Sequence, residues 1–243
     1  MTADDVAWCC SQWRTKSMDP VRGLSQSTRI VYIAHLRKLL RQINANWQSL
    51  AGLAKPTLPT PRTVVVPDEQ YEAVLSIAEA RCRFLLLCAR EAGLRTYAAQ
   101  SLRAENVIMD GSTMWLSGRT KQGGFFHVPA TERLKVEVMY AMSKARPGET
   151  LEQALGPNRK PLTDAYRHQV LARAQKELGF KGRWTYHDLR RTAALKVYES
   201  TGNIRLAQQF LSHRSLQATC WYLQAGQPKL TADMVEKALR IEE

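Results

Sequence analysis

The sequence predicts a mainly α-helical fold that contains one small β-hairpin, and two observations predict it. Between the glycines and prolines, apolar residues recur every three or four positions, which is the spacing of an amphipathic helix. The segment 106–129 differs, because apolar residues at alternate positions flank a polar turn that contains Gly123 and Gly124. That pattern is typical of two strands joined by a tight turn.

A proline-rich stretch divides the chain. The prolines at 56, 59, 61 and 67 disfavour a helix and favour an extended linker. We therefore predict a short helical arm at 1–55, a linker at 56–67 and a larger domain at 68–243. A long surface loop inside a single domain is the alternative.

The helices are expected from apolar periodicity alone. In the arm, apolar residues at helical spacing with basic residues between them predict a helix at 25–46. In the larger domain, one or two helices are expected within 68–92. Further helices are expected at 96–103, 131–145, 163–178, 187–201, 203–211, 215–223 and about 230–240.

The composition points to a polyanionic partner. Lys and Arg number 35 against 22 Asp and Glu, so the formal net charge is +13 and the pI is about 9.8. Basic groups placed on phosphates release condensed counterions, which favours nucleic acid as the partner. A basic protein without a specific ligand is the alternative.

Several other classes are not supported. The five cysteines show no CxxC spacing, and no Asp, Glu and His cluster has the spacing of metal ligands, so we expect no metal or cofactor. No segment resembles a signal peptide or is long and apolar enough to span a bilayer. We therefore expect no membrane partner and a cytoplasmic location.

The segment 185–192 carries the first candidate site. Thr185 and Asp188 have the spacing of a capping box, which predicts the start of a helix there. His187 and Arg190 then lie three residues apart on one face of its first turns. An imidazole beside a guanidinium at a helix N-terminus is suited to holding a phosphate. A surface His and a solvated Arg are the alternative for this short motif.

Four more residues complete the candidate set. Arg95 follows a glycine between two predicted helices, and Lys121 lies in the hairpin turn. His213 precedes Tyr222 by a separation that allows both to face one cleft. Taken singly, these residues have simpler explanations: an arginine at a helix end, a solvated turn lysine and a half-buried core tyrosine.

The order of these motifs resembles the tyrosine recombinase, or phage integrase, family over about residues 68–243. The matching pieces are Gly93-Leu94-Arg95, the hairpin lysine, His187-Asp188-Leu189-Arg190, Leu211-Ser212-His213 and Tyr222. The resemblance implies a recombinase catalytic domain preceded by a short helical DNA-binding arm.

The resemblance also implies a role for each residue. Arg95 and Arg190 would hold the scissile phosphate, and His187 and His213 would flank it. Lys121 would protonate the leaving 5′ oxygen, and Tyr222 would be the nucleophile that forms a 3′-phosphotyrosine. The implied activity is site-specific cleavage and rejoining of DNA, as in integration, excision or resolution.

The sequence departs from the family pattern in three places. Ala98 occupies a position that is commonly acidic, and Ser212 replaces the glycine that precedes the histidine. We expect Ser212 to alter backbone geometry more than chemistry. The arm at 1–55 has room for about two good helices instead of four.

The resemblance implies partners as well. We expect double-stranded DNA, a homo-oligomer that forms a tetramer in synapsis, and an accessory DNA-bending protein. The resemblance also implies that the protein is associated with the bacterial nucleoid when it is bound to DNA. The terminal helix at about 230–240 carries an apolar stripe and is expected to dock on a neighbouring subunit, with docking on its own core as the alternative. A type IB topoisomerase and a noncatalytic DNA-binding relative are the alternative functions.

Overall fold

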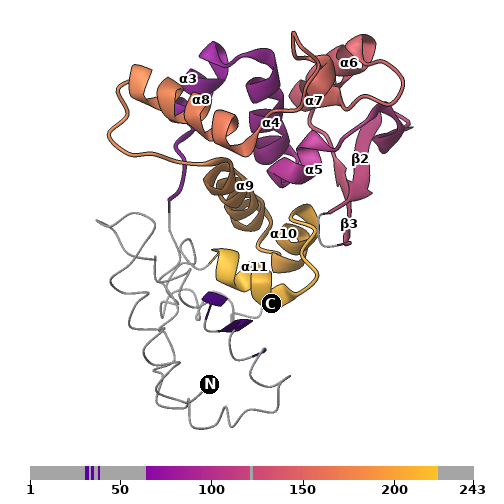
Figure 1. Ribbon diagram of the computed structural model, residues 1–243. Coiled ribbons are helices and arrows are strands. Elements are labelled where there is room, and N and C mark those ends of the chain that lie inside the picture. The colour runs from indigo at the N-terminus through magenta and orange to yellow at the C-terminus, as the bar shows by residue number, and fades with distance from the viewer. Residues whose placement is uncertain (1–30, 33, 36–37, 39–63, 121–122, 224–243) are drawn as a thin grey trace, which may run out of the picture. The chain divides into compact units, whose positions relative to one another are not determined.

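The computed structural model describes residues 31, 32, 34, 35, 38, 64–120 and 123–223 (Figure 1). The chain divides into two compact units, 1–62 and 63–243. The described residues of the first unit are helical and lie within the helix predicted at 25–46. The rest of the predicted arm, most of the linker and the terminal helix at about 230–240 lie outside the described residues.

The second unit is mainly helical, as predicted. Its helices are α3 Asp68–Ile77, α4 Ala80–Glu91, α5 Thr96–Gln100, η2 Ala104–Asn106, α6 Glu132–Lys144, α7 Leu151–Ala154, α8 Asp164–Glu177, α9 Tyr186–Thr201, α10 Ile204–Phe210 and α11 Leu216–Leu223. The predicted segment 68–92 therefore forms two helices. The short helix α7 was not predicted, because a single turn leaves no periodicity to recognise.

The sheet has three antiparallel strands in the order β1-β2-β3, where β1 is Val107–Asp110, β2 is Thr113–Arg119 and β3 is Phe125–Pro129. The predicted hairpin is β2 and β3, with Leu116 opposite Val128. Strand β1 was missed because it opens with consecutive apolar residues that do not alternate with polar ones. It forms an edge, and Ile108 lies opposite Trp115.

Helix α4 forms the centre of the main hydrophobic core. Six consecutive side chains, from Phe84 to Ala89, are buried. A helix that is apolar around most of its circumference is stable only when other elements surround it. Helices α5, α6, α7, α8 and α9 all contact α4, so the helix that leads to Gly93 is held on several sides.

Helix α9 connects this core to a second, smaller one (Figure 1). Leu189 near its start belongs to the main core, whereas Ala194 and Leu195 pack with residues of α10 and α11 in the second cluster. Tyr222 packs against the edge of that second cluster. The start of α9 and the end of α11 are therefore brought to the same region.

Candidate active site

The side chain of Tyr222 lies partly exposed on α11, next to the start of α9. Its hydroxyl donates a hydrogen bond to the backbone carbonyl of His187 at 3.1 Å. The Nδ1 atom of His187 lies 3.3 Å from the same hydroxyl. The ring of His213 meets the ring of Tyr222 edge to face, with centroids 5.4 Å apart. Three of the sequence-predicted residues therefore converge.

The position of His187 follows from how α9 begins. Thr185 is its N-cap, and the predicted capping box with Asp188 is present in both directions. Just before it, the buried side chain of Gln175 bonds both the N–H and the carbonyl of Trp184, at 3.1 and 2.9 Å. Because these contacts satisfy buried backbone groups, they hold the first turn of α9, and with it His187, in one place.

Arg190 is buried in the middle of the site, with 3% of its surface exposed. Its Nη1 donates to the carbonyl of Gly93, and its Nη2 donates to the carbonyl of Leu211 at 2.6 Å. The guanidinium thus connects the chain segment before Arg95 with the segment before His213. Its Nε is buried and has no hydrogen-bond partner among the described residues.

Arg95 follows a glycine whose identity the structure explains. Gly93 has a φ of +57°, and a Cβ built there would lie 2.5 Å from the ring of Phe210. Glycine alone meets both conditions without strain. The chain then turns into α5, with Arg95 as the residue before its first turn. Arg95 lines the same hollow as His187, and its charge lowers the pKa values of His187, His213 and Tyr222.

His213 follows Ser212 in the turn between α10 and α11. Ser212 has a φ of +49°, the left-handed region that glycine enters most easily. This is the position where the family pattern has glycine, and the expectation that Ser212 alters the backbone geometry there stays a prediction. The Oγ1 of Thr219 lies 3.1 Å from Nδ1 of His213, which leaves Nε2 as the ring nitrogen for a substrate.

The cluster perturbs the ionisation of its members. Burial, then the charges of Arg190 and Arg95, lower the pKa of His213 to about 4. Loss of hydration and the same two arginines lower the pKa of His187. Both imidazoles are therefore neutral at pH 7.

The two remaining shifts concern Tyr222 and Arg190. Burial raises the pKa of Tyr222, against the opposing effect of the Arg190 charge. Burial lowers the pKa of Arg190 to about 10, which leaves its guanidinium charged at neutral pH. A positive charge beside a protonated phenol favours the phenolate as the proton departs.

Two positions that the sequence singled out, Lys121 and Ala98, need separate description. Lys121 lies outside the described residues, so its place in the site stays a prediction. Ala98 is buried in the main core. Neither polar neighbour replaces the missing acid: Gln100 bonds Arg167 and the carbonyl of Leu162, and Glu91 pairs with Arg133.

The arrangement agrees with comparison to known proteins. The model of the phage integrase family matches residues 65–227. The chain belongs to the phage integrase family. This confirms the family inferred from the order of the motifs. A curated relative, the tyrosine recombinase XerC of Leptospira interrogans serogroup Icterohaemorrhagiae serovar copenhageni, is 24% identical over 170 residues, which cover 69% of this chain and 54% of the relative.

Solved structures of recombinases and integrases share the fold. XerH recombinase, solved with a palindromic difH substrate, has a TM-score of 0.70 at 19% identity and covers 98% of this chain and 71% of its own. A λ integrase fragment, solved as a dimer on a COC′ core site, has a TM-score of 0.69 at 17% identity, with coverage of 96% and 84%. The Tn1549 transposon integrase, solved with circular intermediate DNA, has a TM-score of 0.69 at 14% identity, with coverage of 99% and 85%.

Sequence reasoning missed the contacts that orient this family member's site. Thr219 contacts His213, and the carbonyls of Gly93 and Leu211 accept hydrogen bonds from Arg190. No local sequence pattern marks these three residues as part of the site. Within the described residues, no cluster of three or more His, Cys, Asp or Glu could hold a metal ion. No helix in the described part of the chain is both long and apolar enough to cross a membrane.

Proposed function

We propose that this protein cleaves and rejoins DNA at a specific site through a covalent phosphotyrosine at Tyr222. The observation that carries the proposal is the meeting of a phenol hydroxyl with His187, Arg190 and His213, side chains from separate parts of the chain. Membership of the phage integrase family supports it. Double-stranded DNA is the proposed substrate, since the related XerH and λ integrase structures contain DNA sites.

The chemistry follows from the charges in the cluster. The Tyr222 oxygen attacks the phosphorus, the bond to the 5′ oxygen breaks, and the enzyme keeps the 3′ phosphate. Negative charge grows on the nonbridging oxygens, where the guanidiniums of Arg95 and Arg190 are the proposed donors. Removing one such donor typically costs about 3 kcal/mol of transition-state stabilisation, or roughly a hundredfold in rate.

The protons need acceptors and donors that the cluster can supply. The neutral His187 lies at hydrogen-bonding distance from the phenol and is the proposed acceptor of its proton. His213 is the proposed neutral hydrogen-bond partner of a nonbridging oxygen. Lys121 is the proposed donor to the leaving 5′ oxygen. Rejoining reverses these steps and needs no ATP, because the phosphotyrosine retains the energy of the broken bond.

Assembly is proposed on the same basis. A homo-oligomer that forms a tetramer on two DNA sites would bring four tyrosines together, and the terminal helix at about 230–240 is proposed to dock between subunits. The helical arm at 1–55 is proposed to hold the far side of the DNA, with an accessory DNA-bending protein as a further partner.

Covalent trapping tests the function directly. A binding site is first selected from random duplexes with the full-length Tyr222→Phe protein, and substrates nicked near the expected cleavage point are then made from it. The wild-type protein should form a covalent protein–DNA band that resists denaturation. Tyr222→Phe should form none, because it lacks the nucleophilic oxygen.

Tyr198→Phe is the matched control, since Tyr198 is also half-buried and packs against the same cluster as Tyr222. It should retain the covalent band. A band of equal strength from Tyr222→Phe would overturn the proposal. Relaxation of plasmids that lack the selected site would instead indicate a topoisomerase.

A further inference from the structure

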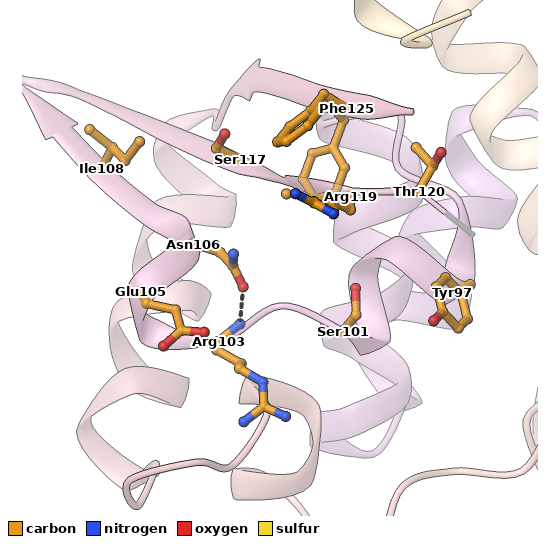
Figure 2. Close-up of a pocket in the computed structure, with 12 residues that line it drawn as sticks. Tyr97, Ser101, Arg103, Glu105, Asn106, Ile108, Ser117, Arg119, Thr120 and Phe125 are labelled. Atoms are coloured by element: carbon orange, nitrogen blue, oxygen red, sulfur yellow. Dashed lines mark hydrogen bonds between the residues drawn. The ribbon is translucent and has the colours of Figure 1, made fainter. Parts of the chain in front are cut away.

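A groove of about 590 Å³ lies beside the candidate active site, between α5 and the sheet (Figure 2). Tyr97 on α5 and Ser101 just after it line one side, and Arg119 and Phe125 on β2 and β3 line the other. None of these residues has a role in the cleavage chemistry proposed above. The groove is open to solvent, and its lining mixes aromatic, basic and neutral polar side chains with one acidic residue, Glu105, and the apolar Ile108.

This groove continues into a hollow that two of the predicted catalytic residues line. A second hollow of about 460 Å³ is lined by Arg95 and His187, and it shares Tyr97 and Thr120 with the groove. Tyr97 therefore stands at the junction of the two. A DNA strand with a phosphate at Arg95 could continue past Tyr97 into the groove without leaving the protein surface.

Two aromatic side chains of the groove are exposed to solvent. Phe125 is 66% exposed and Tyr97 is 54% exposed. The guanidinium of Arg119 lies over the Phe125 ring at 5.3 Å, and no carboxylate of the described residues pairs with it. An open ring beside an unpaired cation can bind both parts of a nucleotide, because the ring stacks on the base and the cation attracts the phosphate.

The ligand must have a free base face. Inside a duplex both faces of a base are covered by its neighbours, so an aromatic side chain can stack only on an unpaired nucleotide. Cleavage at Tyr222 would release a 5′ end, and that end must separate from its complement before it can join another duplex. The proposed function therefore generates unpaired nucleotides next to this groove.

We propose that the groove between α5 and the sheet binds an unpaired nucleotide of the cleaved strand, with Phe125 stacking on the base and Arg119 contacting the phosphate. This inference rests on the proposed function and names a second binding site for the same DNA. Tyr97 forms the wall where the strand enters. Glu105 lies at the side of the groove away from Tyr97 (Figure 2), where its negative charge opposes a phosphate and so limits how far the strand extends.

Single-strand binding tests this site apart from catalysis. The full-length Tyr222→Phe protein is titrated with a fluorescent single-stranded oligonucleotide of mixed sequence and with a hairpin duplex of the same sequence, at one fixed salt concentration. Phe125→Ala and Arg119→Gln, each added to Tyr222→Phe, should lower single-strand affinity about tenfold, as expected for loss of one stacking or cationic contact. Duplex affinity should change less than twofold.

The chain offers a matched control. Tyr140 on α6 is 49% exposed and lies under the Lys144 ammonium at 5.5 Å, so it is a similar open ring with a cation, but it does not line the groove. Tyr140→Ala should leave single-strand affinity unchanged. Phe125→Trp keeps a stacking surface and should restore binding, which separates lost stacking from misfolding.

The outcomes are distinct. Equal losses for single strand and duplex, no loss in Phe125→Ala, no recovery in Phe125→Trp, or a similar loss in Tyr140→Ala would each overturn the groove assignment. The covalent-trapping experiment would be unaffected by any of these results. Absence of a covalent band from the wild type would instead count against the proposed function.

Discussion

The ionisation and hydrogen bonding of individual site residues depend more on their surroundings than on the side-chain type. His213 and His187 would each titrate near pH 6.5 in an open chain, but two neighbouring guanidiniums and reduced hydration keep them neutral in the fold. Arg190 uses two of its nitrogens to hold backbone carbonyls and keeps one buried donor unpaired. Its role is therefore structural as well as electrostatic.

The lowered pKa of His213 makes a pH dependence testable. Folded His213 binds a proton only near pH 4, whereas the unfolded chain binds one near pH 6.5. Between these values the unfolded state holds more protons, so the free energy of unfolding should fall as the pH is lowered from about 6.5 towards 4. Denaturant unfolding at several pH values measures this slope.

His213→Gln provides the comparison, because glutamine does not titrate. Its free energy of unfolding should change less steeply with pH over the same window. His187 contributes in the same direction and remains in both proteins, so the variant should retain part of the slope. Identical slopes for the two proteins would contradict the shifted pKa of His213.

At the level of elements, the junctions between helices place the site. The α4–α5 junction contains Gly93, the α10–α11 turn contains Ser212, and both adopt positive φ. Arg190 bonds the carbonyls of Gly93 and Leu211, which lie two residues before Arg95 and His213. The two turns are therefore fixed against α9, and a change in either should be transmitted to the proposed catalytic side chains.

Replacing Gly93 by alanine should reveal how tight that junction is. Any L-residue at this φ costs about 1–2 kcal/mol, and the new methyl would also lie 2.5 Å from the Phe210 ring. Overpacking of this kind adds about 1–3 kcal/mol. The free energy of unfolding of Gly93→Ala should accordingly fall by about 2–5 kcal/mol.

Gly202→Ala isolates the packing contribution, since Gly202 has a φ of +63° and open space around a built Cβ. It should lose only the backbone part, about 1–2 kcal/mol. Adding Phe210→Leu to Gly93→Ala should recover some of the difference in a double-mutant cycle. Equal losses at the two glycines would show that Phe210 is not a constraint.

For the whole molecule, the net charge of +13 is the property that bears most on the proposed partner. Among the described residues, Arg214 is an exposed cation next to the site: it lines a hollow with His213, and a Cβ built at Gly124 in the hairpin would lie 3.3 Å from its Nε. Cations in such positions act over the length of a DNA backbone and not on one phosphate alone.

Duplex binding should therefore weaken steeply with salt. Each phosphate contact contributes about −0.9 to the slope of log affinity against log salt, so six contacts would lower affinity about a thousandfold between 50 and 200 mM. Arg214→Gln should flatten the slope by about one contact. Lys144→Gln, on α6 and away from the site, should leave the slope unchanged. An affinity that does not depend on the salt concentration would argue against DNA as the partner.

The sequence by itself determined the longer helices of the described catalytic-domain residues, the β2–β3 hairpin, the capping box at Thr185 and the family, because periodicity, capping and motif order are local or linear properties. Tertiary structure alone decided that Arg190 would reach Gly93, a residue 97 positions away, and that Thr219 would hold His213. It also decided the edge strand β1 and the groove beneath Phe125. These depend on contacts between distant segments, and such contacts form only when the hydrophobic cores bring α4, α9 and α11 together.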